Sequence, residues 1–223
     1  NRFAFAAALA TVLSASAVLP AQAQESLTLK KFKDTGNITL GHRESSIPFS
    51  YYNDQQQVIG YSQELMLKAV DGVKEQLKLA KLDTKLMPVT SANRITLVQN
   101  GTIDIECGST TNSVERQKTV SFGPTYFVIN VTAAVKKNSG IKTLADLNGK
   151  TISTTSGTTA VPLLKGYEKT RGVDIKEIYG KDHAESFLLL AQDRVSAFVM
   201  DDVLLAGQIA NAQNPGEYMI IKE

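Results

Sequence analysis

Apolar and polar positions in the first half of the chain alternate between strand-like and helix-like spacing. The pattern at 37–43, 85–89 and 102–107 consists of short apolar runs, which predict three strands. Between them, 61–77 and 91–101 carry apolar residues at helical spacing, with Ser91 as a plausible N-cap for the second helix. The order strand–helix–strand–helix–strand predicts a parallel sheet with crossover helices.

A second series of the same kind begins near residue 131. Strands are expected at 131–137, 150–155, 173–180 and 195–202. Helical segments are expected at 143–149, 156–172, 183–194 and 203–213. The extended stretch "PTYFVINV" joins the two series. The pattern therefore predicts an α/β protein with two lobes and a cleft between them.

The ends of the chain carry separate information. Residues 1–23 contain Arg2, then a nearly uncharged run, and close on the small-x-small pattern Ala21-Gln22-Ala23, so we expect a secretory signal peptide. A membrane anchor is the weaker interpretation, because Pro20 breaks the run. At the other end, "GEYMIIKE" stops inside a strand-like run, and we expect the natural chain to be longer.

Charge and composition exclude several classes of partner. The chain has 24 basic and 22 acidic residues, a net charge of +2, which becomes +1 without Arg2. This balance gives no reason to expect a nucleic-acid or anionic-membrane partner. One cysteine and two histidines make a zinc site unlikely, and we expect no metal, no cofactor and a monomer.

The candidate ligand-binding residues lie in the loops that follow the predicted strands, where parallel α/β proteins bind ligands. These loops hold Arg43, Arg94, Arg116, His183 and Asp201, among many serines and threonines. A single arginine beside a helix is usually solvated. Three arginines at strand-end loops, interleaved with hydroxyls, predict an anion-binding site.

The residue types indicate what that anion is. An arginine fork matches a carboxylate bidentately, and a buried carboxylate needs its lone pairs satisfied. "SGTT" at 156–159 opens a helix and would add backbone N–H groups. Asp201 among these cations suggests that the ligand also carries an ammonium. Two carboxylates and one ammonium describe glutamate or aspartate.

Catalytic interpretations have weaker support. "SGTT" lacks the nucleophile elbow G-x-S-x-G, and "NGKT" would need glycine where Leu144 stands to form a P-loop. His183 has no evident serine or cysteine partner, and is either a ligand contact or an ordinary polar loop residue. Cys107 follows a strand pattern and is expected to be buried, unless a further cysteine pairs with it.

Several longer motifs carry a family resemblance. "ECGSTTNSVERQKTVSFGPTYF", "DLNGKTISTTSGTT" and "AFVMDDVLLAG" resemble the periplasmic amino-acid-binding proteins of ABC transporters, solute-binding protein family 3. The similarity is greatest to the glutamate/aspartate-binding branch, which also shows "GHRESS-PFSYY", "TS-NR" and "KDH". It extends colinearly over nearly all of residues 36–215.

The resemblance implies a type II periplasmic-binding-protein fold, in which each lobe is a mostly parallel sheet flanked by helices. The implied boundaries are 1–23 for the signal peptide, 24–130 for lobe 1, 131–216 for lobe 2 and 217–223 for the start of a return to lobe 1. The family's final return segment, with a second cysteine in this branch, is absent from this sequence. An incomplete core is therefore expected in lobe 1, and Cys107 lacks its implied partner.

The resemblance also implies roles for ten residues. Arg116 looks like the arginine that pairs with the α-carboxylate, assisted by Ser109 and Thr111. Asp201 looks like the acceptor for the α-ammonium.

The remaining residues would select the acidic side chain and close over the ligand. The set expected to recognise the side-chain carboxylate is Arg43, Ser91, Arg94 and His183. Thr158 and Thr159 would contact carboxylate oxygens from the second lobe. Which carboxylate each hydroxyl serves stays open.

The resemblance implies a periplasmic receptor, without enzymatic activity, that binds L-glutamate or L-aspartate by lobe closure and delivers it to an inner-membrane ABC permease. One alternative is a dehydratase-like periplasmic enzyme on the same scaffold. Another is the sensor domain of a receptor kinase. Asp201 together with three arginines favours binding over turnover. The sequence does not rank glutamate against aspartate, which differ by one methylene.

Overall fold

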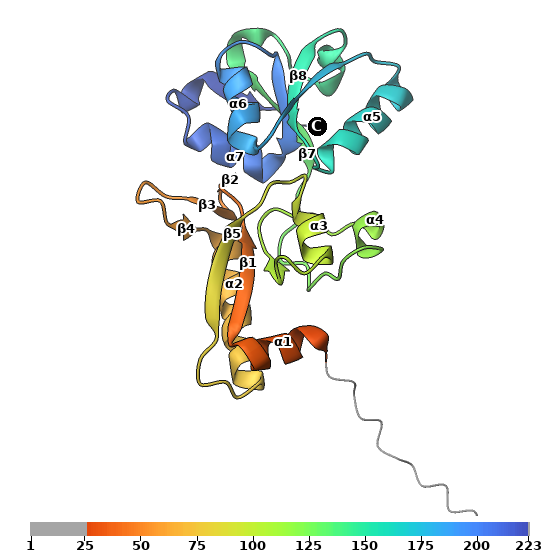
Figure 1. Cartoon of the computed structure of the whole chain (residues 1–223). Helices are drawn as coiled ribbons and strands as arrows, with labels where there is room; N and C mark the ends of the chain where they lie inside the picture. The colour runs from red at the N-terminus through yellow and green to blue at the C-terminus, as the bar shows by residue number, and fades with distance from the viewer. Residues whose placement is uncertain (1–25, 223) are drawn as a thin grey trace, which may run out of the picture.

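The computed structural model describes residues 26–222, so the signal peptide expected at 1–23 lies outside the described residues. Two groups of elements are stacked one above the other (Figure 1). We call the group built on the sheet β5-β1-β6 the first lobe, and the group built on the sheet β11-β7-β10-β8-β9 the second lobe. The predicted two-lobed α/β architecture is confirmed.

The first lobe contains the predicted parallel sheet. Its strands are β1 (Asn37–His42), β5 (Asp83–Pro88) and β6 (Ile105–Glu106), with β1 pairing in parallel to both neighbours. Its longer helices are α1 (Leu27–Thr35), α2 (Tyr61–Gln76) and α3 (Arg94–Gln99). Phe32, Ile38, Leu40, Met66 and Val70 pack between helices and sheet.

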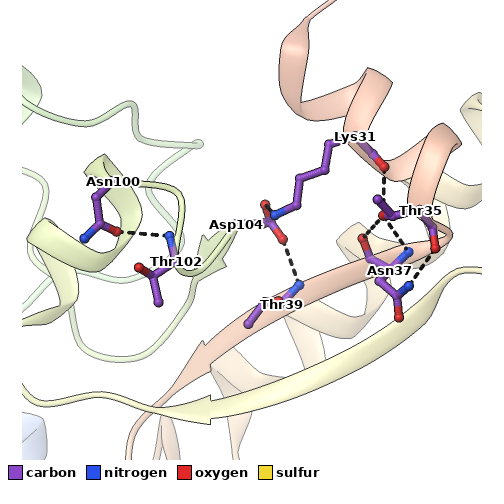
Figure 2. A network of polar contacts seen from close by, with 7 residues as sticks. All are labelled: Lys31, Thr35, Asn37, Thr39, Asn100, Thr102 and Asp104. Atoms are coloured by element: carbon purple, nitrogen blue, oxygen red, sulfur yellow. Dashed lines mark hydrogen bonds and ion pairs between the residues drawn. The ribbon is translucent and has the colours of Figure 1, made fainter.

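One buried carboxylate fixes α1 against this sheet (Figure 2). Asp104 Oδ2 accepts a hydrogen bond from the backbone N–H of Thr39 at 2.8 Å, and Asp104 Oδ1 pairs with Lys31 Nζ at 2.7 Å. The Asp104 side chain is only 4% exposed. The sequence pattern did not predict α1, because its polar, lysine-rich run buries a single residue, Phe32.

A small antiparallel sheet follows β1 and was also not predicted. It is formed by β2 (Ser45–Ser46), β3 (Ser50–Tyr52) and β4 (Val58–Ile59). Strands this short carry too few residues for a period-two pattern to be recognised.

The expected N-cap of α3 is corrected by the structure. Asn93 rather than Ser91 precedes the helix. The reason is a local turn, in which the Thr90 N–H donates to Asn93 Oδ1 at 2.8 Å and the Asn93 N–H donates to Thr90 Oγ1 at 3.2 Å. Ser91 is buried, and its hydroxyl has no hydrogen-bond partner within residues 26–222.

The second lobe has a five-stranded sheet. Strands β8 (Thr151–Thr155), β9 (Lys176–Gly180) and β10 (Ala197–Asp201) run parallel, whereas β7 (Val131–Lys136) is antiparallel to β10. Strand β11 (Tyr218–Ile220) lies at the sheet edge, antiparallel to β7. The parallel part was predicted. The reversed direction of β7 was not, because direction follows from the connection and not from the strand pattern.

Helices α5 (Ala160–Arg171), α6 (His183–Ala191) and α7 (Asp202–Ala210) cover this sheet, with short 3-10 turns at 137–139, 144–147 and 215–217. All five residues of β10 are buried, as expected for a strand covered on both faces. Phe198 and Met200 pack in one core cluster, and Ala197 and Val199 in another. The rigid core thereby fixes Asp201, the last residue of β10.

Within the described residues, no helix combines the length and the apolar character needed to cross a membrane.

Candidate ligand-binding site

The two lobes face each other, with β2 of the first lobe below α7 of the second (Figure 1). We call the region between the lobes the cleft, and three contacts between described site residues cross it. Arg116 Nη2 donates to the Gly157 carbonyl at 3.1 Å, Thr159 Oγ1 donates to Thr111 Oγ1 at 3.3 Å, and Ser109 Oγ lies 3.5 Å from His183 Nε2. The structure is therefore a closed form, with five predicted site residues already in contact.

Arg43 is oriented by the end of β1. Its side chain is buried, with Nε donating to the Val89 carbonyl at 3.0 Å and Nη1 donating to Ser109 Oγ at 3.3 Å. Its backbone N–H donates to Ser50 Oγ at 2.9 Å. Burial, followed by the charge of Arg94, lowers the pKa of Arg43 to about 10. The guanidinium is thus held in one orientation at an electrostatic cost.

Arg94 is the least satisfied charged group of the site. It begins α3, is 2% exposed, and its Nε and Nη1 have no hydrogen-bond partner in the described part of the chain. Burial lowers its pKa, while the negative charges of Glu106 and Asp201 oppose that shift. A buried guanidinium with free donors is expensive to maintain unless an anion binds to it.

Arg116 also belongs to the first lobe and reaches across the cleft to the second lobe. It lies in the short helix α4 (Val114–Gln117), whose N-cap Ser113 accepts the Arg116 backbone N–H at 3.3 Å. Nη1 donates to the Thr111 carbonyl at 2.9 Å. The side chain is half-buried, and burial, followed by the charge of Arg94, lowers its pKa to about 10.

Asp201 supplies the opposite charge from the second lobe. It is 5% exposed, and burial raises its pKa to about 6 against the opposing effect of Arg94. A raised pKa means that the ionised carboxylate is under-stabilised in this environment. A ligand ammonium beside Asp201 would stabilise its ionised form.

His183 begins α6 and is fully buried. Its Nδ1 lies 3.0 Å from Thr155 Oγ1, and burial, with Arg43 and Arg94 nearby, lowers its pKa well below the usual value. Folding brings Ser109 of the other lobe to His183, a neighbour that was not evident from the sequence.

This serine–histidine contact does not form a nucleophilic triad. Ser109 Oγ donates its proton to Ser46 Oγ at 3.2 Å, and Nδ1 of His183 faces a hydroxyl instead of a carboxylate. The contact therefore belongs to a hydrogen-bond network that links Arg43, Ser109 and His183.

The remaining predicted residues line the same region. Thr158 is buried and donates to the Thr155 carbonyl at 2.8 Å. Ser91 lies across from the turn of the second lobe, since its carbonyl is 2.7 Å from the position that a Cβ on Gly157 would take. The contacts divide the predicted set into a group around Arg43, Ser109 and His183 and a group around Arg116, Thr111 and Thr159. The ligand roles of all ten residues remain predictions.

A cavity of about 830 Å³ borders the cleft on the side of the first lobe. Its polar wall contains Arg94, Ser109, Thr111 and Asp201, together with a residue that sequence reasoning had not selected, Glu106. The rest of its lining is mostly apolar and comes from α2, α3 and residues 120–129. The sequence offered one indication that Glu106 belongs to the site: it is the last residue of an apolar strand and precedes a loop that leads to an arginine.

Cys107 is half-buried and its thiol lies 3.7 Å from Tyr126 Oη. Burial raises the pKa of this thiol, which disfavours a reactive thiolate. In residues 26–222 no cluster of three or more histidine, cysteine, aspartate or glutamate side chains could hold a metal ion.

Comparison with known proteins decides the family. Residues 38–215 match the model of the bacterial extracellular solute-binding proteins, family 3. The chain belongs to this family. Among its relatives, the "Glutamate/aspartate import solute-binding protein" of Escherichia coli is 48% identical over 194 residues, and the "L-glutamate/L-aspartate-binding protein" of Pseudomonas aeruginosa is 49% identical over 194 residues. These alignments cover 87% and 86% of this chain and 64% of each relative, so the chain spans about two thirds of their length.

Solved structures agree on the fold. A mutant of ArgBP from T. maritima superposes with a TM-score of 0.75 at 22% identity, covering 87% of this chain and 79% of that one. The cysteine-binding protein of Campylobacter jejuni gives a TM-score of 0.73 at 27% identity, covering 88% of this chain and 75% of that one. The two-lobed fold of this family is therefore shared.

Proposed function

We propose that this chain is the substrate-binding component of an ABC importer, and that it binds L-glutamate and L-aspartate in the cleft between its lobes. The observation that carries the proposal is that Arg94 is buried with two donor nitrogens that lack a partner among residues 26–222, while Asp201 is buried with a raised pKa. A ligand that carries both a carboxylate and an ammonium would satisfy both groups. The names of the E. coli and P. aeruginosa relatives support the same ligand class.

The geometry supports a division of labour within the cleft. Arg116 and Thr111 would bind the α-carboxylate, with Thr159 closing from the second lobe. Arg43, Arg94 and His183 would bind the side-chain carboxylate, because they are the more deeply buried cations and donors. Ser109 contacts both Arg43 and His183, which supports a role for its hydroxyl beside the side-chain carboxylate.

The cellular setting follows from the proposed function. A family of bacterial extracellular solute-binding proteins operates outside the cytoplasm, and we place this chain in the periplasm. Its partner would be an inner-membrane permease. The lobes would be formed by residues 24–130 and 131–216, with 217–223 beginning the next crossing. Strand β7, which begins at Val131, supports the boundary between them.

The test is isothermal titration calorimetry of the chain with a panel of ligands: glutamate, aspartate, glutamine, asparagine and arginine. Tight binding of the two acidic amino acids and weak binding of the amides and arginine are expected. Equal affinity for glutamate and glutamine would contradict the proposal that the chain selects acidic amino acids. Release of a modified product during incubation would show an enzyme instead.

A further inference from the structure

The arginine cluster of the cleft contains an internal carboxylate that the proposed binding roles do not use. Glu106 ends β6, on the loop that leads to Ser109 and Thr111. Its Oε2 accepts the hydroxyl proton of Thr110 at 2.5 Å, and its Oε1 is buried with no hydrogen-bond partner within residues 26–222. The carboxylate forms no ion pair with a lysine or arginine in that part of the chain.

Gly108 brings Glu106 and Arg43 together. A Cβ built on Gly108 would lie 2.5 Å from Arg43 Cγ and 2.8 Å from Glu106 Oε1. The absence of a side chain at this position therefore makes room for both groups. Glu106 also lines the cavity that borders Arg94 and Asp201.

The charge of Glu106 acts on all three arginines. Its carboxylate opposes the lowering of the pKa of Arg43, Arg94 and Arg116, and it acts on each more strongly than Asp201 or any other carboxylate does. Asp182 and Glu44 act more weakly, and only on Arg43.

The charges of the closed cleft define which ligand neutralises it. His183 is buried and neutral, and apart from Glu44 and Asp182, which act only on Arg43, the three arginines together with Glu106 and Asp201 leave one net positive charge. A ligand with one net negative charge would balance the cleft. Without Glu106, the balance would move to a ligand with two.

We propose that Glu106 is a specificity-determining residue, whose carboxylate sets the net charge of the preferred ligand at minus one without touching the ligand. This inference rests on the proposed function, because it assumes an acidic amino acid in the cleft. It adds a selection by total charge to the selection by arginine contacts.

The test uses three ligands of similar size and different net charge: glutamine (zero), glutamate (minus one) and 2-oxoglutarate (minus two). Calorimetry, with competition where binding is weak, is carried out on the wild-type chain and on Glu106→Gln. Gln keeps the shape and an acceptor for Thr110. We expect affinity in Glu106→Gln to rise relative to wild type by roughly tenfold for each added negative charge on the ligand.

Three matched variants separate charge from shape. Glu106→Asp keeps the charge in a shorter side chain and should preserve the wild-type ranking, whereas Glu106→Asn should behave like Glu106→Gln. Glu115→Gln removes a carboxylate from an exposed position on α4 and should leave the ranking unchanged. The comparison of Glu106 with Glu106→Gln and the comparison of Glu106→Asp with Glu106→Asn each test the inference. If a variant of one comparison does not fold, the other comparison still gives the answer.

Two results would overturn the role of Glu106. One is a change in affinity that is equal for all three ligands, and the other is a change in the order of ligand affinities that is as large in Glu106→Asp as in Glu106→Asn. Failure of the wild-type chain to bind glutamate would overturn the proposed function, and this inference with it. A wild-type chain that prefers glutamate, with neutral variants of unchanged ranking, would leave the proposed function standing and remove only this inference.

Discussion

The three arginines of the cleft differ in how many of their donor nitrogens lack a hydrogen-bond partner within the described residues, and this difference predicts how much each contributes to ligand binding. Arg43 and Arg116 donate to backbone carbonyls, whereas two nitrogens of Arg94 have no partner in the described chain. A bound carboxylate would therefore change the hydrogen bonding of Arg94 most. The sequence predicted that all three lie in loops at strand ends, because the helix and strand patterns define where those loops occur.

Arg94→Met tests this difference. The variant keeps the bulk of the side chain and removes its charge, so we expect glutamate binding to weaken by about 2–5 kcal/mol and glutamine binding to weaken much less. Calorimetry with both ligands is the measurement. If the two affinities fall equally, Arg94 does not select the acidic side chain.

The raised pKa of Asp201 predicts a pH dependence of stability. Its pKa is about 6 in the folded chain against a usual value of 3.8, so between these values the folded chain holds a proton that the unfolded chain has released. The contribution to stability therefore increases as pH falls from above 6 to below 3.8. Asp201→Asn should stabilise the ligand-free chain by about 3 kcal/mol at pH 7, with no gain at pH 3.5.

Ligand affinity should depend on the same group with the opposite sign. An ammonium requires the ionised carboxylate, so glutamate affinity should fall as pH decreases through 6, with proton release on binding near that pH. Urea unfolding across pH checks the stability effect, and calorimetry in buffers of different ionisation enthalpy checks the proton release. Retention of the wild-type proton release in Asp201→Asn would assign it to another group.

At the scale of elements, the turn between β8 and α5 is one place where the backbones of the two lobes come close together. Gly157 has φ +75°, and a Cβ there would lie 2.5 Å from Ala92 Cα and 2.7 Å from Ala92 N, both in the first lobe. A side chain at this position would therefore meet backbone across the cleft. The same residue accepts a hydrogen bond from Arg116 through its carbonyl.

Gly157→Ala should impair closure. Positive φ and the backbone clash together are expected to cost about 1–3 kcal/mol in the closed form, which weakens glutamate binding roughly 10- to 100-fold. Gly166→Ala in the exposed middle of α5 is the matched control, because its Cβ would meet nothing within 4 Å. The control should bind normally and gain about 0.5–1 kcal/mol of stability. Equal binding by both variants would contradict the close approach at Gly157.

The accuracy of the sequence predictions also differed between elements. Long amphipathic or fully buried segments such as α2, α6 and β10 were predicted, because their periodicity reflects burial. The elements α1 and β2–β4 were missed, since a single buried residue or a two-residue strand leaves no periodic trace. The contact between Ser109 and His183 joins residues 74 positions apart, and only the stacking of two lobes reveals it.

At the scale of the whole molecule, hydrogen bonds made by residues outside the proposed ligand site also connect the two lobes. Gln208 on α7 donates from Nε2 to the Ser45 carbonyl at 2.7 Å, and the Ala184 N–H donates to Ser45 Oγ at 3.4 Å. These contacts favour closure without contacting the proposed ligand. Ligand would add its own contacts to both lobes and shift the population toward the closed form.

Small-angle X-ray scattering tests this shift. The radius of gyration of the wild-type chain should fall when glutamate is added, because an open population is converted to the closed form. Gln208→Ala should increase the radius of gyration of the ligand-free chain and leave the ligand-saturated value unchanged. A radius of gyration that does not respond to saturating glutamate would show that binding occurs without lobe movement.

Burial of Arg43 and Arg94 has a kinetic consequence. With 1% and 2% of their surfaces exposed, both guanidinium groups are shielded from solvent while the lobes stay together. Under the proposed function, the rate at which the lobes part would then limit the release of a carboxylate bound to them, and added competitor would not shorten its residence time. If the proposed permease partner receives the amino acid, its transfer would then depend on the lobes separating first.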